Sequence, residues 1–210
     1  MRGAERGLFV TLEGIDGTGK STQSMALARA LREMGREVLL TREPGGSTGA
    51  EEIRRLLLEG PPDRWSAETE ILLFTAARRD HMEKTIQPAL EAGRIVVCDR
   101  FADSTRVYQG ITRGDLRGKV DALHDLMIGR DPDLTFVLDM PPDKGLARAR
   151  ARNNGEERFE DFGLGMQERM RTGFLELAQT LPHRCRVIDA NRAPDIIAAD
   201  IFRLVRRALP

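Results

Sequence analysis

The sequence contains only two cysteines in 210 residues and no excess of either charge. Its 33 basic and 33 acidic residues cancel, so no global positive field indicates a nucleic-acid polymer as a partner. Nowhere do about 18 apolar residues run together, as a membrane-spanning helix requires. Residues 1–7 are too short and polar to be a signal peptide. Cys98 and Cys185 adjoin apolar runs that predict buried strands, and free core thiols suit a reducing compartment, so we expect a cytoplasmic protein with no membrane partner.

Residues 14–21 match the G-x-x-x-x-G-K-[ST] pattern of a phosphate-binding loop. An apolar run at 8–13 predicts a buried strand before it, and a helical pattern at 21–34 follows. The glycines allow backbone N–H groups to surround a phosphate, Lys20 can reach the outer phosphates, and the Ser21 hydroxyl is placed for Mg²⁺. A glycine-rich turn without a ligand would not require Lys and Ser at these offsets, so we interpret the segment as a phosphate site.

The rest of the chain alternates between short apolar runs and helical patterns, without repeats or low-complexity tracts. Strands are predicted at 8–13, 37–41, 95–98, 134–138 and 186–189. Helices are predicted at about 21–34, 49–58, 66–92 with a kink or division near Pro88, 103–108, 116–128, 143–152, 168–181 and 194–209. This alternation predicts one α/β domain over 1–210, a three-layer fold whose five-stranded parallel sheet carries helices on both faces and ligands at the carboxyl ends of the strands.

Asp99 and Arg100 directly follow the predicted strand 95–98. A carboxylate at this strand end could face a metal ion, and the guanidinium beside it could bind a phosphate. The alternative is a simple salt bridge between the two neighbours.

A polar segment with one glycine, 153–158, lies between two predicted helices. Such a segment is typical of a flap over a site, although a plain surface loop is the alternative. Three arginines precede it, and on a helix Arg148 and Arg152 share one face while Arg150 points nearly opposite. We therefore expect Arg152, nearest the flap, to act in the site and Arg150 to be solvated.

Taken in chain order, these motifs resemble those of the thymidylate kinase family, within the P-loop nucleoside monophosphate kinase superfamily. The matching segments are 14–21, 41–46, 74–78, 99–101, 104–110, 132–135, 138–139 and 148–152. The resemblance implies transfer of the γ-phosphoryl group of ATP to dTMP, giving dTDP, with Mg²⁺ as cofactor and a homodimer as the assembly. A kinase for another nucleoside monophosphate would keep the phosphate side and change the base pocket, and it stays open as the alternative.

The same resemblance implies roles for individual residues. The ATP-binding residues are Gly14, Ile15, Asp16, Gly17, Thr18, Gly19, Lys20, Ser21 and Thr22. The dTMP-binding residues are Arg42, Arg54, Phe74, Arg78, Arg100, Thr105, Tyr108 and Gln109. Ser21 and Asp99 are the expected metal ligands, and the expected catalytic residues are Asp16, Lys20, Arg100 and Arg152. Pro44 matches a position that often follows a cis peptide bond.

The acceptor residues agree with the chemistry of thymine. Phe74 and Arg78, at i and i+4 of a helix, would offer a ring for stacking and a donor-only guanidinium. Such a group matches the O4 acceptor of thymine and would oppose the N4 amine of cytosine. Thr105 and Gln109 resemble the contacts to the far edge of the base, and Tyr108 resembles the residue that disfavours a 2′-hydroxyl.

The chain also departs from the family pattern. Some relatives carry an arginine where this loop has Gly17, so the lid at about 148–162 is expected to supply the catalytic positive charge through Arg152, helped by Arg158. Phe101 replaces the Tyr or His often found there, and we assign it no role.

A nucleotide-dependent switch and a non-catalytic nucleotide-binding subunit are the other classes of protein that a phosphate loop suits. The subunit would have no use for the acceptor-side residues. Asp115 and Gly118 have D-x-x-G spacing, but they follow a polar turn rather than a strand. The sequence also lacks the Asn-Lys-x-Asp motif that recognises guanine. The sequence therefore favours a kinase.

Overall fold

The computed structural model describes residues 7–61, 63–111, 114–151 and 163–209. Within them, five parallel strands form one sheet in the order β2-β3-β1-β4-β5, which confirms the predicted sheet. The strands are β1 (Phe9–Glu13), β2 (Val38–Arg42), β3 (Ile95–Asp99), β4 (Leu134–Asp139) and β5 (Cys185–Asp189). Because β1 is central and buried throughout, the loop that follows it emerges in the middle of the sheet edge.

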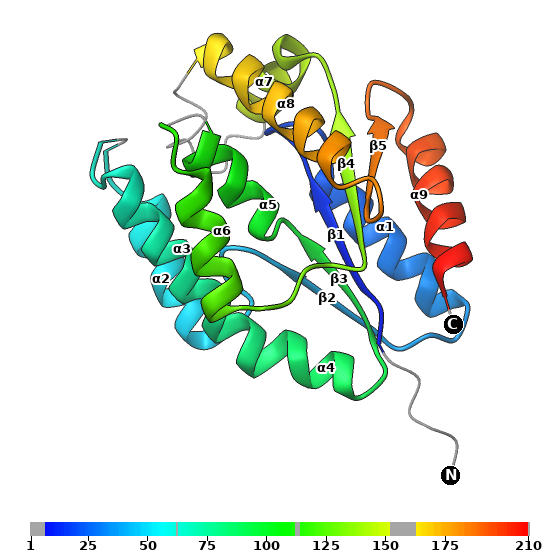
Figure 1. Cartoon of the computed structure of the whole chain (residues 1–210). Helices are drawn as coiled ribbons and strands as arrows, with labels where there is room; N and C mark the ends of the chain where they lie inside the picture. The colour runs from blue at the N-terminus through cyan, green and yellow to red at the C-terminus, as the bar shows by residue number, and fades with distance from the viewer. Residues whose placement is uncertain (1–6, 62, 112–113, 152–162, 210) are drawn as a thin grey trace.

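Helices cover both faces of the sheet (Figure 1). One face packs on α1 (Lys20–Glu33) and α9 (Pro194–Ala208), and Val10 and Leu12 of β1 point into this layer. The helical segments of the other layer and of the sheet's upper end are α2 (Thr48–Leu58), α3 (Ala67–His81), η1 (Met82–Ile86), α4 (Gln87–Glu91), α5 (Ala102–Thr105), η2 (Arg106–Ile111), α6 (Arg117–Met127), α7 (Pro142–Arg150) and α8 (Gly163–Thr180). Alternation along β1 thus places its even and odd positions in different cores.

The helix predicted over 66–92 is divided into α3, the π-helical turn η1 and α4. Pro88 lies in the first turn of α4, where its missing N–H and its ring prevent an ordinary α-helical continuation from the residues before it. The wider turn of η1 accommodates this break. The sequence correctly placed a disruption near Pro88 but did not predict the π geometry.

Two other predicted boundaries were wrong. The helix expected at 103–108 consists of the short α5 followed by the π-helical η2. The helix expected to begin at Glu168 begins at Gly163, so it is a turn longer than predicted. Boundaries follow tertiary packing as well as local pattern, and both segments pack against the same core around Phe174.

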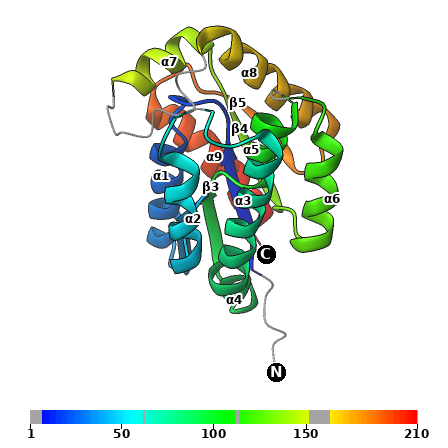
Figure 2. The same ribbon diagram turned by 90° about the vertical axis from the view of Figure 1, so that its left-hand side faces the viewer.

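The carboxyl ends of the central strands lie together at one edge of the sheet. The phosphate loop follows β1, Asp99 ends β3 and Asp139 ends β4. Figure 2 shows α2 and α3 side by side in front of β3, with α6 beyond α3. This arrangement surrounds the β1 and β3 ends with helices and places the candidate site where parallel sheets ordinarily bind ligands.

Candidate active site

A cavity of about 430 Å³ opens at the carboxyl ends of β1 and β3. Its volume lies within the range of roughly 300–1,000 Å³ that is usual for small-molecule sites. The phosphate loop contributes Asp16, Gly17, Gly19, Lys20 and Ser21 to its lining. All eight residues expected on the acceptor side also line it, namely Arg42, Arg54, Phe74, Arg78, Arg100, Thr105, Tyr108 and Gln109.

Four of the expected nucleotide-binding residues lie outside this lining. They are Gly14, Ile15, Thr18 and Thr22. Gly14, Ile15 and Thr18 are buried, and the Thr18 hydroxyl donates to the Ile15 carbonyl at 3.0 Å, which holds the loop in shape. Backbone groups of such a loop, rather than its side chains, are what a phosphate would contact.

Lys20 lies folded across its own loop. Its Nζ donates to the carbonyl oxygens of Gly14 at 3.0 Å and Ile15 at 2.8 Å, and it lies 4.0 Å from Asp16 Oδ1. Burial and the neighbouring Arg100 together lower the pKa of Lys20 to about 8, against the opposing effect of Asp16. An incoming anion would therefore meet an ammonium group that lacks a full counter-charge.

The phosphate loop touches the helix that leads towards residues 152–162. A Cβ on Gly17 would lie only 1.9 Å from the Gly145 carbonyl of α7, and Gly17 has a φ of 81°. A side chain at this position would thus meet both backbone strain and a clash. The described backbone therefore favours glycine at position 17.

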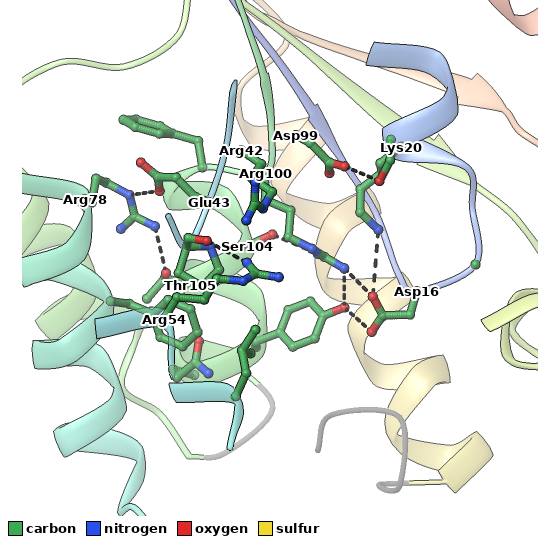
Figure 3. A pocket seen from close by; sticks show the side chains of 18 of the residues that line it. Asp16, Lys20, Arg42, Glu43, Arg54, Arg78, Asp99, Arg100, Ser104 and Thr105 are labelled. Atoms are coloured by element: carbon green, nitrogen blue, oxygen red, sulfur yellow. Dashed lines mark hydrogen bonds and ion pairs between the residues drawn. The ribbon is translucent and has the colours of Figure 1, made fainter. Parts of the chain in front are cut away.

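Arg100 connects the phosphate loop to the acceptor side of the cavity (Figure 3). Its guanidinium pairs with Asp16 and donates to Gly14 O at 3.2 Å, Ser104 Oγ at 3.0 Å and Tyr108 Oη at 3.3 Å. The Tyr108 hydroxyl donates to Asp16 Oδ2 at 3.1 Å. The guanidinium also lies 5.1 Å from the Tyr108 ring centre. Arg100 therefore joins Gly14, Asp16, Ser104 and Tyr108 in one hydrogen-bonded cluster.

The charges in this cluster stabilise one another. Burial raises the pKa of Asp16, but Arg100 and Lys20 outweigh burial, so the net shift is downward and the carboxylate is ionised. Burial lowers the pKa of Arg100, while Tyr108 and Asp16 raise it to a net upward shift. Burial raises the pKa of Tyr108, so its hydroxyl stays a donor at neutral pH.

Asp99 does not pair with its neighbour Arg100, so the salt bridge weighed as an alternative is absent between these two described residues. Instead, Ser21 Oγ donates to Asp99 Oδ2 at 2.5 Å, and Arg100 turns towards Asp16. A hydroxyl and a carboxylate so close together suit Mg²⁺, which takes oxygen ligands and commonly binds one or two carboxylates plus phosphates. The donor set fits the expected ion.

Arg78 lies in the wall of the acceptor side, and only 3% of it is exposed. Its Nε donates to Glu43 Oε2 at 2.7 Å and its Nη2 donates to Thr105 Oγ1 at 3.1 Å. Gln109 Nε2 donates to Glu70 Oε2 at 3.0 Å. The expected base-contacting groups are therefore already oriented by protein partners.

Two further arginines of the cavity lining, Arg42 and Arg54, come from β2 and α2. Arg42 Nη2 lies 3.2 Å from Glu51, and Arg54 Nη1 donates to the Pro44 carbonyl at 2.6 Å. The Glu43–Pro44 peptide bond is cis, as the family resemblance implied. The turn after β2 thus brings both guanidinium groups to the same wall.

Sequence reasoning missed Glu13, which ends β1 and is fully buried. Its carboxylate accepts from Phe101 N at 2.7 Å and from Ser104 N and Oγ at 3.2 and 2.6 Å. Burial and the nearby Asp103 raise the pKa of Glu13 to about 7. Glu13 therefore anchors the turn after β3, which contains Arg100. An acidic residue ending an otherwise apolar strand was the available signal.

Phe101 also has a place in the site, although the sequence suggested none. It is buried, packs edge-on against Phe9 at 4.9 Å between ring centres, and lies beneath the Arg78 guanidinium at 5.1 Å. The face of the Phe101 ring makes a cation–π contact with the Arg78 guanidinium.

The lid assignments fall largely outside the described residues. Arg152 and most of the expected lid, 152–162, are among the residues that the structure does not describe. Arg148 and Arg150 are both exposed on α7, and neither lines the described cavity. Burial therefore does not distinguish the helix face of Arg148 from that of Arg150.

Comparisons with known proteins agree with this geometry. A sequence model of the thymidylate kinase family matches residues 12–201. The chain is 68% identical to a thymidylate kinase of Ruegeria pomeroyi, over 95% of this chain and 94% of that protein. It is 67% identical to a thymidylate kinase of Dinoroseobacter shibae, over 93% and 95%. A crystal structure of a thymidylate kinase from Ehrlichia chaffeensis superposes with a TM-score of 0.78 at 36% identity, covering 96% of this chain and 99% of that one. The chain belongs to the thymidylate kinase family.

Proposed function

We propose that this protein transfers the γ-phosphoryl group of ATP to dTMP, giving dTDP and ADP. One observation carries the proposal: a single cavity joins the phosphate loop to all eight expected acceptor residues. A non-catalytic nucleotide-binding protein would have no use for the acceptor wall. A phosphoryl donor at the loop and a monophosphate against that wall would meet between Lys20 and Arg100.

The reaction requires positioning and positive charge more than covalent help from the protein. An oxygen of the dTMP phosphate attacks the γ-phosphorus, and the bond to the β,γ-bridging oxygen breaks. Lys20 and Arg100 stabilise the charge on the transferred group, since both lie at the loop end of the cavity. Asp16 orients Arg100 and, through its place beside Tyr108, faces the sugar of the acceptor.

Ser21 and Asp99 would hold Mg²⁺, which when bound neutralises phosphate charge. On the acceptor side, Phe74 stacks on the base and Arg78 donates to thymine O4. Tyr108 crowds the 2′ position of the sugar, and this role is supported by its burial against Asp16 and Arg100. Arg42, Arg54 and Arg100 bind the acceptor phosphate, as expected of guanidinium groups around a phosphate site.

Arg152, with Arg158, supplies further positive charge from the lid in this proposal, and that role rests on the sequence alone.

A homodimer is supported by exposed apolar side chains on the neighbouring helices α2, α3 and α6. These are Leu56, Leu72, Leu126 and Met127, which are 42%, 58%, 79% and 41% exposed.

A cytoplasmic location is supported by the two free buried cysteines. Among the described helices, none has the length and apolar character to cross a membrane.

The proposed activity is tested by incubating the purified protein with ATP, Mg²⁺ and a panel of nucleoside monophosphates. We expect dTDP and ADP in equal amounts, with dTMP preferred over dCMP, dAMP and dGMP. Product identity is checked by anion-exchange chromatography. Turnover of another monophosphate at a higher kcat/KM than dTMP would instead support the alternative acceptor.

The lowered pKa of Lys20 predicts a pH dependence. The ammonium form is present below a pKa of about 8 and is lost as the pH rises through that value. We therefore expect kcat/KM for ATP, which reports the free enzyme, to fall above pH 8 by up to tenfold per unit. Bound phosphates favour the charged amine, so kcat should begin to fall only at higher pH.

The control for this profile is Lys20→Arg, because a guanidinium stays charged throughout the range. Whatever its absolute rate, this variant should lack the decline near pH 8. If the decline persists in Lys20→Arg, another group causes it.

A further inference from the structure

We propose that Glu43 is a positioning residue that sets the preference for thymine by locking the orientation of Arg78. The inference rests on the proposed role of Arg78 as the donor to O4. Glu43 directly follows β2 and does not belong to the set of expected ligand contacts. Only 6% of it is exposed, and it lines the cavity beside Arg78.

The Arg78 guanidinium has three partners, and Figure 3 shows two of them, Glu43 and Thr105. Glu43 Oε2 accepts from Nε at 2.7 Å, and Thr105 Oγ1 accepts from Nη2 at 3.1 Å. The third partner is the Phe101 ring, whose centre lies 5.1 Å from Arg78 Cζ. Among the described residues, these hydrogen bonds engage two of the five N–H groups of the guanidinium. The remaining N–H groups belong to a planar fork whose direction is fixed once Nε is held.

Glu43 is itself fixed by a second partner. Its other oxygen, Oε1, lies 3.1 Å from Nδ1 of His81, and Nε2 of His81 lies 2.8 Å from Thr41 Oγ1. His81 is fully buried at the end of α3, and Thr41 belongs to β2. The carboxylate therefore bridges Arg78 and His81 of α3 from the turn after β2, and it cannot rotate without losing one of these contacts.

Rigidity is what base selection requires here. A freely turning arginine could donate to thymine O4 and turn aside when cytosine presents its N4 amine. A locked arginine still donates to O4, but it leaves two donors facing each other when cytosine enters. Discrimination then comes from the unfavourable contact with the wrong base as much as from the favourable one. The short, buried pair with Glu43 provides this lock, since an ion pair out of water holds its geometry more strongly than an exposed one.

The test measures kcat/KM for dTMP and dCMP in Glu43→Gln, Arg78→Gln and the double variant. Glutamine keeps the length of Glu43 and can still accept one hydrogen bond, but it loses the charge. We expect Glu43→Gln to reduce the dTMP-to-dCMP ratio roughly tenfold, to raise KM for dTMP, and to leave KM for ATP unchanged. The double variant should discriminate no worse than Arg78→Gln alone, because both changes remove one interaction.

Glu83→Gln is the matched control. Glu83 pairs with Arg79, the neighbour of Arg78, at 3.2 Å, but both side chains are more than half exposed and lie away from the cavity lining. This variant should keep the wild-type ratio. Should Glu43→Gln not fold, Glu43→Asp retains the charge and shortens the side chain, so it should lower the ratio by pulling Arg78 out of line.

The outcomes separate this inference from the proposed function. If Arg78→Gln reduces the ratio and a folded Glu43 variant does not, the inference is wrong and the role of Arg78 stands. An equal loss of activity towards both nucleotides in Glu43→Gln would likewise overturn it, since that is what a purely structural role predicts. If neither variant changes the ratio while dTMP is still phosphorylated, another group reads the base and the assignment of Arg78 fails.

Discussion

Replacing Lys20 with alanine is expected to lower kcat at least about a hundredfold, because a positioned charge on a phosphoryl transition state commonly contributes several kcal/mol. Lys20 is 7% exposed and lies where the phosphate loop meets the cavity. Its partners in the described structure are two loop carbonyls and the more distant Asp16, so the ammonium is free to exchange these contacts for phosphate oxygens.

The same variant should remain folded. The pKa of Lys20 is lowered from 10.5 to about 8, so the folded protein holds the charged form less readily than the unfolded chain does. At pH 7 this charge therefore opposes folding, and its removal should leave the melting temperature unchanged or raise it. Steady-state assays and thermal unfolding at the same pH measure both effects.

Arg29→Ala is the control for Lys20→Ala. Arg29 is a cation of the same helix α1, its side chain is 79% exposed, and its nearest acidic partner, Glu33, is 4.0 Å away. Its removal should change kcat less than twofold. Near-normal turnover by Lys20→Ala would exclude Lys20 from the chemical step.

The second large effect is expected for Arg100→Ala, with kcat/KM for dTMP reduced a hundredfold or more. Arg100 donates to Gly14, Ser104, Asp16 and Tyr108, so its loss removes a phosphate-binding cation and also the group that joins the loop to the acceptor wall. A φ of 70° is as unfavourable for alanine as for arginine, so the substitution would not relieve backbone strain at this position.

Arg100→Ala should also move the pH profile. Arg100 lowers the pKa of Lys20, so without it the Lys20 ammonium survives to higher pH and the decline in kcat/KM for ATP should shift above pH 8. Loss of activity with no such shift would contradict the electrostatic coupling, even if Arg100 binds phosphate. The coupling is measured by repeating the pH series on this variant.

Two comparisons sharpen the Arg100 result. Arg100→Lys keeps a positive charge but lacks the planar fork, so it should recover only part of the lost activity. Arg203→Ala removes an exposed arginine of α9 that pairs with Asp200 at 2.7 Å, and it should be nearly neutral. Wild-type activity in Arg100→Lys would show that charge alone matters at this position.

Local pattern predicted those features that depend on residues close together in the chain. Strands followed from apolar runs such as 95–98, because a strand buried on both faces excludes polar side chains. The break near Pro88 followed from the missing N–H of proline, although the π-helical turn that resolves it depends on how Met82 and Ile86 pack in the core. Helix limits were least predictable, since packing partners extend a helix beyond its local signals, as at Gly163.

The site itself was predicted in part. Family motifs named the residues of the acceptor wall, and the fold brings all of them to one cavity. They did not reveal that Arg78 is buried and paired, that Phe101 supports it, or that Glu13 anchors the turn after β3. Those contacts lie between side chains whose separation in sequence hides them.

By itself, the sequence determined the phosphate loop, the alternation of strands and helices, and the family, because glycine offsets and hydrophobic periods act within a few residues. Only the tertiary structure decided which charges meet. Parallel pairing of Leu12 with Asp99 sets the end of β1 beside the turn after β3, and this register brings Arg100 to Asp16 and Ser104 to Glu13. Ionic contacts weaken with distance and strengthen with burial, so the chemistry of these side chains depends on a packing arrangement that no short stretch of sequence contains.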